Sequence, residues 1–250
     1  MKVLASDYDG TLNMGGTVSK ENIEAIKKWR AAGNLFGMVS GRNLGSLKQI
    51  LNMDNVPYDF LVGCNGAVIT DADGNAVGET CIPPRMAKAM LHELHRFEAQ
   101  YVSASYDWGS TDASVDSDIR ADDDVLMIDG TRLSRVYQVS AAYFCAEHTQ
   151  IVRNACQAMF PGEIIGLIPG VLGIDFITVG TSKADGIRNL VSNRGIDPEI
   201  ILTVGDGEND LAMLTAPDFC GYAMKTSMPV VLERVSRTTK SVAALIEEYL

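Results

Sequence analysis

Two aspartates lie two residues apart near the start of the chain, in segment 7–11 (DYDGT). Both carboxylates can serve one site if the chain leaves a strand at this point, and Gly10 permits the tight turn that this requires. In such a pair, one acid can be a nucleophile and the other a general acid and base. Taken alone, two acids beside a glycine are also compatible with a simple turn.

Three further polar segments have compositions that suit phosphate and metal binding. Segment 40–42 (SGR) offers a hydroxyl and backbone N–H groups ahead of a predicted helix, and such groups bind phosphate oxygens. Lys183 lies near a predicted helix start, where its ammonium can neutralise charge that grows on a phosphoryl group. Segment 205–210 (GDGEND) places oxygen ligands beside glycines, which suits a hard cation such as Mg²⁺.

Each of these segments follows a stretch that we predict to be a strand. Short apolar runs occupy 2–6, 35–39 and 200–204, and a further strand is predicted at 175–179, ahead of Lys183. Strands that alternate with helices, as they do in this part of the chain, predict a parallel sheet with helices on both faces. Because ligands bind beyond the carboxyl ends of such strands, we expect the four segments to converge.

The strand–helix alternation is interrupted in the middle of the chain. Residues 67–80 predict a hairpin with Asp73-Gly74 at its turn, and Pro83-Pro84 interrupts the regular secondary structure after it. The insert then contains, in order, a helix at 86–100, an acidic loop-like stretch at 107–124, a strand at 135–144 and a helix at 147–160.

A fold class and a domain division follow from this pattern. We predict an α/β fold with a doubly wound parallel-sheet core at residues 1–81 and 173–250. Residues 82–172 are predicted to form a smaller α+β domain inserted into that core. The core would therefore be built from both ends of the chain.

Composition and charge exclude several classes of protein. The 250 residues are 46% hydrophobic and 21% charged, which is typical of a globular protein with a sizeable core. The formal net charge of −11 disfavours binding to nucleic acid or to an anionic membrane. We expect no membrane span and no signal peptide, since no apolar run approaches about 20 residues. Scattered cysteines without a CxxC pair favour reduced thiols and a cytoplasmic location.

Taken in order, the four segments resemble the four signature motifs of the haloacid dehalogenase superfamily. The matches are DxDGT at Asp7 to Thr11, SGR at Ser40 to Arg42, the single Lys183, and GDGxND at Gly205 to Asp210. The form of the last motif, and the insert between the second and third, resemble the Cof-type branch with a C2B cap (subfamily IIB). The resemblance covers essentially the whole chain, and it implies a Rossmann-like core with an inserted cap domain.

The same resemblance implies a Mg²⁺-dependent phosphatase that hydrolyses a small phosphomonoester, such as a sugar phosphate. Asp7 would be the nucleophile that forms an aspartyl-phosphate. Asp9 would protonate the leaving oxygen and then activate water. Mg²⁺ would be held by the carboxylates of Asp7 and Asp206 and by the backbone carbonyl of Asp9.

Further residues are assigned by the resemblance to the phosphoryl group and to support of the site. The phosphoryl group would be held by Ser40, Gly41, Lys183 and Asn209. The supporting residues would be Thr11, Arg42 and Asp210, the last of them through waters of the metal.

Two other functions remain open at this point. One is phosphoryl transfer without net hydrolysis, as in a phosphosugar mutase, and release of free phosphate would distinguish the two. The other is a non-catalytic protein that binds a phosphorylated ligand, although both acids of the first motif are present.

Two groups outside the motifs could also bind an ion. His92 and His95 can share a helix face as metal ligands, but no third ligand is suggested nearby. The run Asp122 to Asp124 could bind a cation, and a solvated loop is the simpler interpretation of such a run.

Overall fold

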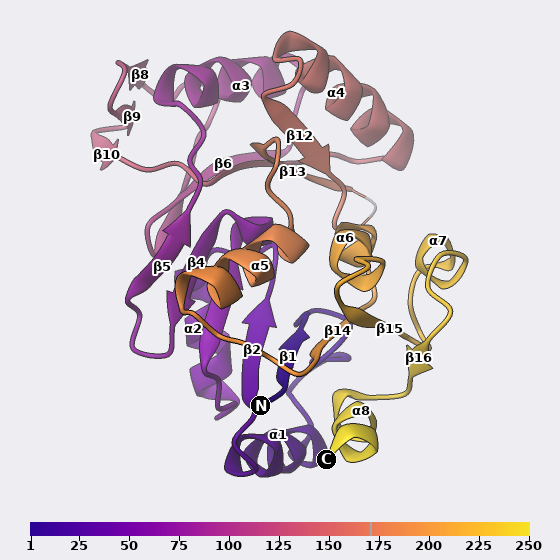
Figure 1. Ribbon diagram of the computed structural model, residues 1–250. Coiled ribbons are helices and arrows are strands. Elements are labelled where there is room, and N and C mark those ends of the chain that lie inside the picture. The colour runs from indigo at the N-terminus through magenta and orange to yellow at the C-terminus, as the bar shows by residue number, and fades with distance from the viewer. Residues whose placement is uncertain (171) are drawn as a thin grey trace.

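The computed structural model describes residues 1–170 and 172–250. An eight-stranded sheet forms the larger domain, which is the lower part of Figure 1. Its parallel strands are, in spatial order, β16 (Thr238–Thr239), β15 (Cys220–Met224), β14 (Ile201–Gly205), β1 (Val3–Ser6), β2 (Leu35–Val39) and β3 (Phe60–Gly63). The antiparallel strands β4 (Val68–Asp71) and β5 (Ala76–Glu79) complete the sheet. The predicted α/β fold class is confirmed.

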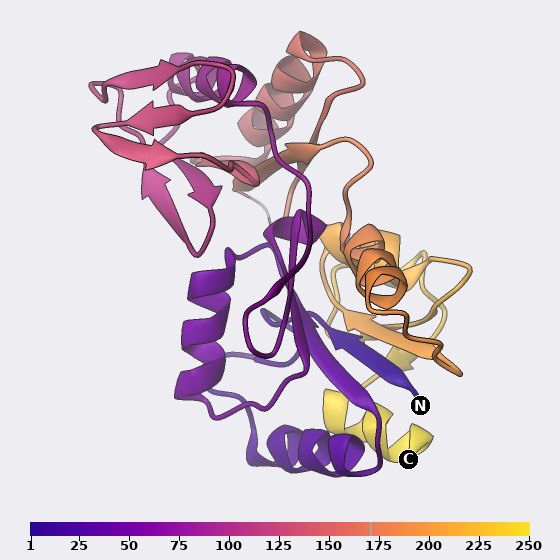
Figure 2. The same ribbon diagram turned by 60° about the vertical axis from the view of Figure 1, so that its left-hand side comes forward.

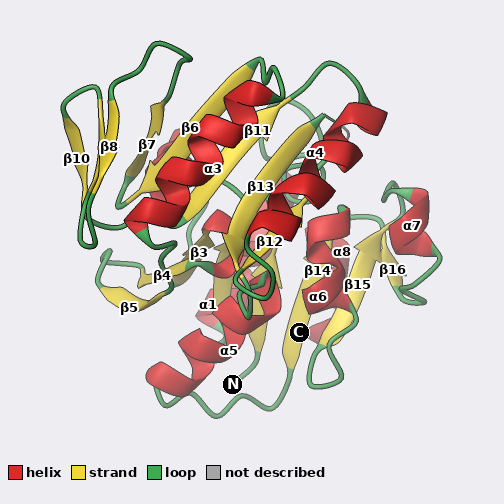
Figure 3. Ribbon diagram, turned by 90° about the horizontal axis from the view of Figure 1, so that it is seen from above, coloured by secondary structure: helices red, strands yellow, loops and turns green. Residues whose placement is uncertain are grey.

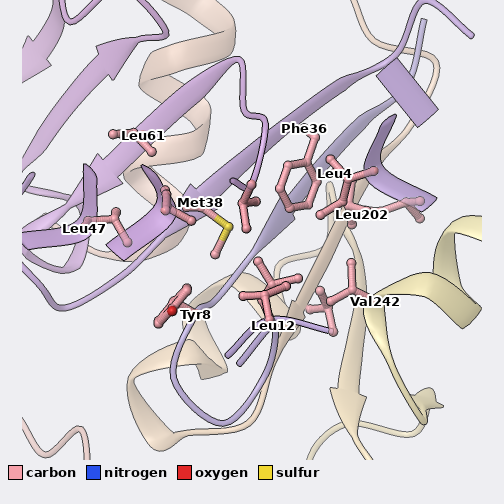
Figure 4. Close-up of a cluster of buried hydrophobic side chains, with 14 of the residues drawn as sticks. Leu4, Tyr8, Leu12, Phe36, Met38, Leu47, Leu61, Leu202 and Val242 are labelled. Carbon is pink, nitrogen blue, oxygen red and sulfur yellow. The ribbon is translucent and has the colours of Figure 1, made fainter. Parts of the chain in front are cut away.

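Both faces of this sheet are buried under helices. Successive residues of a strand point to opposite sides of the sheet, so neighbouring residues pack against different helices. Leu4 of β1 packs on one side with α1 (Lys20–Ala31), α2 (Leu44–Met53) and α8 (Val242–Tyr249). Figure 4 shows this cluster, in which Leu4 lies beside Phe36 and Leu202. Val3 packs on the other side with α5 (Lys183–Asn193), α6 (Leu211–Leu214) and α7 (Pro229–Leu232). Burial on both faces accounts for the continuous apolar runs of the central strands.

The predicted hairpin at 67–80 is confirmed. Strands β4 and β5 pair antiparallel, and Gly74 lies in their turn with a φ of +90°. That φ lies in the left-handed region that glycine adopts readily.

The smaller domain, which we call the cap, is a five-stranded antiparallel sheet covered by two helices. Its strands are, in spatial order, β12 (Ile164–Leu167), β13 (Gly173–Thr178), β11 (Gln138–Ala142), β6 (Tyr101–Tyr106) and β7 (Gly109–Asp112). Helices α3 (Pro84–Arg96) and α4 (Ala146–Met159) lie on the side away from the core domain, as Figures 1 and 3 show. The opposite side of the cap sheet therefore faces the core domain.

The acidic stretch at 107–124, which was predicted as a loop, contains strands β7 and β8 (Ile119–Ala121), and two further short strands follow it. Strands β8, β9 (Leu126–Ile128) and β10 (Thr131–Leu133) form a small sheet at one side of the cap (Figure 2). Ile119, Leu126 and Ile128 are buried in the apolar cluster of the cap. These widely spaced apolar residues provide the buried side of the small sheet, and the many aspartates between them obscured that pattern.

The boundary between the cap and the second part of the core differs from the predicted one at 172/173. Strand β13, which was expected to belong to the core, pairs antiparallel with β11 and β12 of the cap. Its residues Ile174 and Phe176 face the apolar cluster under the cap helices. In the structure, the chain thus re-enters the core domain with α5.

In the part of the chain that the structure describes, no helix is both long and apolar enough to span a membrane. The five cysteines are free thiols.

Candidate active site

A buried ion pair lies at the carboxyl end of the central strand. Asp7, which directly follows β1, is 5% exposed, and Lys183 is 1% exposed. Lys183 Nζ donates to Asp7 Oδ1 at 2.7 Å and to Asp210 Oδ1 at 2.5 Å. Burial raises the pKa of Asp7, and Lys183 opposes that rise. Burial also disfavours the ammonium, but Asp210 and Asp7 outweigh this effect and hold the pKa of Lys183 above its usual range.

Local chain geometry brings Lys183 to this position. It is the first residue of α5, and the N-cap Ser182 accepts a hydrogen bond from the backbone N–H of Asp185. A Cβ atom at Gly66 would lie 2.0 Å from the Ser182 carbonyl oxygen, so only a glycine allows this approach. The loop after β3 therefore leaves room for the lysine-bearing helix start.

The two aspartates of the last motif have different surroundings. Asp210 Oδ2 accepts hydrogen bonds from the backbone N–H groups of Asp206 (3.0 Å) and Gly207 (2.9 Å). Asp206 Oδ1 accepts one from Thr11 Oγ1 at 2.7 Å. A Cβ atom at Gly10, where φ is +79°, would lie 2.3 Å from Asp206 Oδ2. The glycine of the first motif is thus required for Asp206 to lie beside it.

The carboxylates at this point fit a divalent cation. Asp7, Asp206 and Asp210 each bring one oxygen atom into a group in which all lie within 4.8 Å of one another. Burial raises the pKa of Asp206 as it does that of Asp7, because a charged carboxylate is costly away from water. Lys183 offsets only part of this negative charge. An all-oxygen donor set with excess negative charge suits Mg²⁺.

Asp9 lies nearer to solvent than Asp7. Its side chain is 55% exposed, and Arg42 donates to both of its carboxylate oxygens, at 2.7 and 2.9 Å. Asp9 and Asp7 line the same cavity, so the two acids of the first motif serve one site from its mouth and its floor.

Ser40, Gly41 and Asn209 line that cavity as well. Ser40 is buried, and its Oγ accepts from the Arg42 backbone N–H at 3.2 Å. The structure thus brings together the residues of the first, second and fourth motifs at the cavity, with Lys183 behind Asp7.

Asn65, just after β3, was not among the predicted site residues, and it is fully buried with a φ of +55°. Its Oδ1 accepts from Asn209 Nδ2 at 3.0 Å. Its Nδ2 donates to Asp175 Oδ2 at 2.9 Å and to Gln138 Oε1 at 3.0 Å, and both of these residues belong to the cap. Asn65-Gly66 after a predicted strand was a signal for a special turn, but its partners were not visible in the sequence.

The cavity lies between the two domains and has a volume of about 410 Å³. Its floor consists of the core residues described above. Cap residues form its roof, among them Ser103, Gln138, Ser140 and Asp175. Gln138 Nε2 also donates to the Gly41 carbonyl at 3.1 Å, so the roof is hydrogen-bonded directly to the second motif.

The two other candidate ion sites lie in the cap, outside this cavity. In the described chain, the aspartate group above is the one cluster with metal-ligand geometry, and it includes neither His92 nor His95. In the run Asp122 to Asp124, Asp122 Oδ1 accepts from the backbone N–H groups of Asp124 and Val125, and Asp123 pairs with Arg85. These contacts are those of a surface turn.

Comparison with known proteins identifies relatives of the whole chain. The sequence pattern of the haloacid dehalogenase-like hydrolases matches residues 4–244. A Streptococcus pyogenes protein named as a bifunctional phosphatase/peptidyl-prolyl cis-trans isomerase is 27% identical over 261 residues, which cover 97% of this chain and 51% of that protein. This chain thus spans about half the length of that relative.

Two further proteins match over nearly their full length. A 5-amino-6-(5-phospho-D-ribitylamino)uracil phosphatase of Bacillus subtilis is 23% identical over 274 residues, covering 99% of this chain and 97% of that protein. The structure of a haloacid dehalogenase-like hydrolase from B. subtilis superposes with a TM-score of 0.84 at 19% identity, covering 100% of both chains. The structural likeness establishes a shared fold.

Proposed function

The chain belongs to the haloacid dehalogenase-like hydrolases, and on that premise we propose that it is a Mg²⁺-dependent phosphatase acting on a small phosphomonoester. Two relatives that match almost the whole chain are named phosphatases. The observation that carries the proposal is Asp7, a buried carboxylate held by Lys183 on the floor of a cavity, with Asp206 and Asp210 beside it.

In the first step, the carboxylate of Asp7 attacks phosphorus, and the bond from phosphorus to the leaving oxygen breaks. Asp9 in its acid form gives that oxygen a proton, so that a neutral alcohol leaves. Lys183 counters charge near the reacting oxygens from a site where water is largely excluded. The product of this step is an aspartyl-phosphate on Asp7.

In the second step, Asp9, now a carboxylate, takes a proton from water, which attacks phosphorus and releases phosphate and free Asp7. Asp9 is thereby returned to its acid form. Mg²⁺ bound by Asp7 and Asp206 would supply positive charge to the phosphoryl oxygens. Uncatalysed phosphate monoester hydrolysis is so slow that enzymes accelerate it by up to about 10²¹-fold. Division into two steps replaces one difficult reaction by two easier ones.

The cavity supports a small substrate. A volume of about 410 Å³ falls in the range of sites for single metabolites. The B. subtilis relative is named for a substrate with a phosphate on a ribityl chain, which is a small phosphomonoester.

The proposal is tested with para-nitrophenyl phosphate, an aryl phosphate that makes few demands on the cap. We expect Mg²⁺-dependent release of phosphate that EDTA abolishes. Asp7→Asn should reduce kcat by about 10³-fold or more, because an amide is a poor nucleophile. Asp9→Asn should form the phosphoenzyme and hydrolyse it slowly, giving a burst of nitrophenol followed by a low steady rate. Wild-type turnover by the Asp7 variant would refute the assignment of the nucleophile.

A further inference from the structure

One side of the cap sheet presents hydroxyl and amide groups to the cavity. Ser103 and Ser105 of β6, and Gln138 and Ser140 of β11, line the cavity at alternate positions. The residues between them, such as Val139, are buried under the cap helices. This alternation gives the cap sheet one apolar face and one polar face.

The polar residues are neighbours across the strands. Ser103 pairs with Ser140, and Ser140 pairs in turn with Asp175 of β13. In the next row, Ser105 pairs with Gln138 on one side and, on the other, with Ser110 of β7. The roof of the cavity is therefore a continuous polar surface, with hydrogen-bonding side chains on four neighbouring strands.

Asp175 is the one charged side chain that the cap contributes to the cavity lining in the described chain. It is 8% exposed, and no Lys, Arg or His nitrogen of the described residues comes within 4.0 Å of its carboxylate. Ser140 donates to one carboxylate oxygen and Asn65 to the other. Since a carboxylate can accept about four hydrogen bonds, Asp175 has capacity for further donors.

We propose that the cap selects phosphomonoesters whose leaving group is an uncharged polyol, and excludes those that carry a second phosphate or a carboxylate. This inference rests on the proposed phosphatase function and specifies its substrate class. Adjacent hydroxyls of a polyol would donate to Asp175 and exchange hydrogen bonds with the serines and Gln138.

Charge provides the exclusion. Burial raises the pKa of Asp175 to about 6, so the group is an anion at pH 7.5. A second anionic group on the substrate would lie close to this carboxylate. Among the described lining residues, the cap provides no cation that could pair with it. Like charges repel strongly where water is sparse, and a buried anion without a partner is costly. The Asp175 carboxylate likewise disfavours a mutase, which must hold a sugar with phosphates at both ends.

Two substrates that differ only at one carbon test the inference. Glucitol 6-phosphate and 6-phosphogluconate share the carbon chain, the hydroxyls at C2 to C5 and the phosphate at C6. At C1 the first has a hydroxymethyl group and the second a carboxylate. We expect kcat/KM for glucitol 6-phosphate to exceed that for 6-phosphogluconate by about tenfold or more at pH 7.5 with Mg²⁺. Para-nitrophenyl phosphate reports the phosphatase chemistry separately.

A cation added to the roof should weaken or abolish the preference for glucitol 6-phosphate. Ser110 is exposed at the cavity rim, and Ser134 is an exposed serine of the cap outside the cavity lining. Ser110→Lys should raise the efficiency for 6-phosphogluconate relative to glucitol 6-phosphate by about tenfold, because the ammonium pairs with the extra carboxylate. The matched control, Ser134→Lys, should leave that ratio unchanged.

The outcomes separate the inference from the proposed function. Hydrolysis of para-nitrophenyl phosphate together with equal efficiency for both sugar phosphates, or with neither of them hydrolysed, would overturn the cap selectivity and leave the phosphatase intact. Absence of phosphate release from all three compounds would overturn both. A Ser110→Lys variant with an unchanged ratio would also count against the cap as the source of selectivity.

Discussion

At the scale of single residues, Lys183 has the most constrained position in the site. Its ammonium lies between Asp7 and Asp210, and its side chain is almost completely buried. A buried ion pair is costly to desolvate, but loss of one partner is worse, because it leaves the other charges without compensation. The lysine therefore has a structural effect as well as the proposed effect on the phosphoryl group.

We expect Lys183→Met to abolish phosphatase activity and to lower the free energy of unfolding by about 3–5 kcal/mol at pH 7.5 without Mg²⁺. Chemical denaturation measures the second effect. The matched variant Lys183→Arg keeps the charge and should recover part of the stability. If Lys183→Met were as stable as the wild type, the two carboxylates would not depend on the ammonium.

At the scale of elements, the turn between β6 and β7 of the cap packs directly against the core helix α2. A Cβ atom at Gly45 would lie 1.7 Å from the Trp108 carbonyl oxygen, so the backbones touch at this point. Lys48 Nζ lies 5.3 Å from the centroid of the Trp108 ring. On the same turn, Asp107 forms an ion pair with Arg135, which also pairs with Glu79 of the core strand β5. These contacts fix the distance between the roof and the floor of the cavity.

Gly45→Ala should displace the β6–β7 turn and lower kcat/KM by roughly tenfold, since small displacements of the reacting groups are costly. The core should stay folded, because alanine suits a helix. Steady-state kinetics and thermal unfolding measure the two effects. Asn52→Ala, at an exposed position of the same helix, is the control. Wild-type kcat/KM in Gly45→Ala would show that this contact does not set the cavity geometry.

At the scale of the whole molecule, a hydrogen-bond chain joins the two domains through buried polar groups. It runs from Asn209 through Asn65 to Asp175, and Gln138 adds a second link to the core at Gly41. The domain interface is therefore polar, and it includes a titratable group whose charge depends on pH.

The pKa of Asp175, about 6, lies above the ordinary value of 3.8. Between these two values the folded state keeps a proton that the unfolded chain has released. The resulting stability is present at low pH and is lost as pH rises through about 6. Because asparagine does not titrate, the free energy of unfolding relative to Asp175→Asn should fall by about 1.4 kcal/mol from about pH 5 to about pH 7.5. Denaturation of both proteins at both pH values measures this change, and a constant difference would contradict it.

The fold class, the presence of an inserted domain and the four motifs could all be predicted from the amino-acid sequence. Apolar runs report burial, and the motifs are contiguous, so each can be recognised without knowledge of its neighbours. Parallel strands then bring their carboxyl ends to one edge, which is why segments as distant as Asp7 and Asp206 could be expected to meet.

The pairing partner of each strand and the residues that cover the site became visible only in the folded protein. β13 has the apolar pattern of a core strand, and its place in the cap follows from its pairing with β11 and β12. Asn65 and Asp175 are 110 residues apart, and their contact depends on how the two domains are packed together. Hydrogen-bond partners and cavity walls are relations between distant segments, and local sequence patterns carry no information about them.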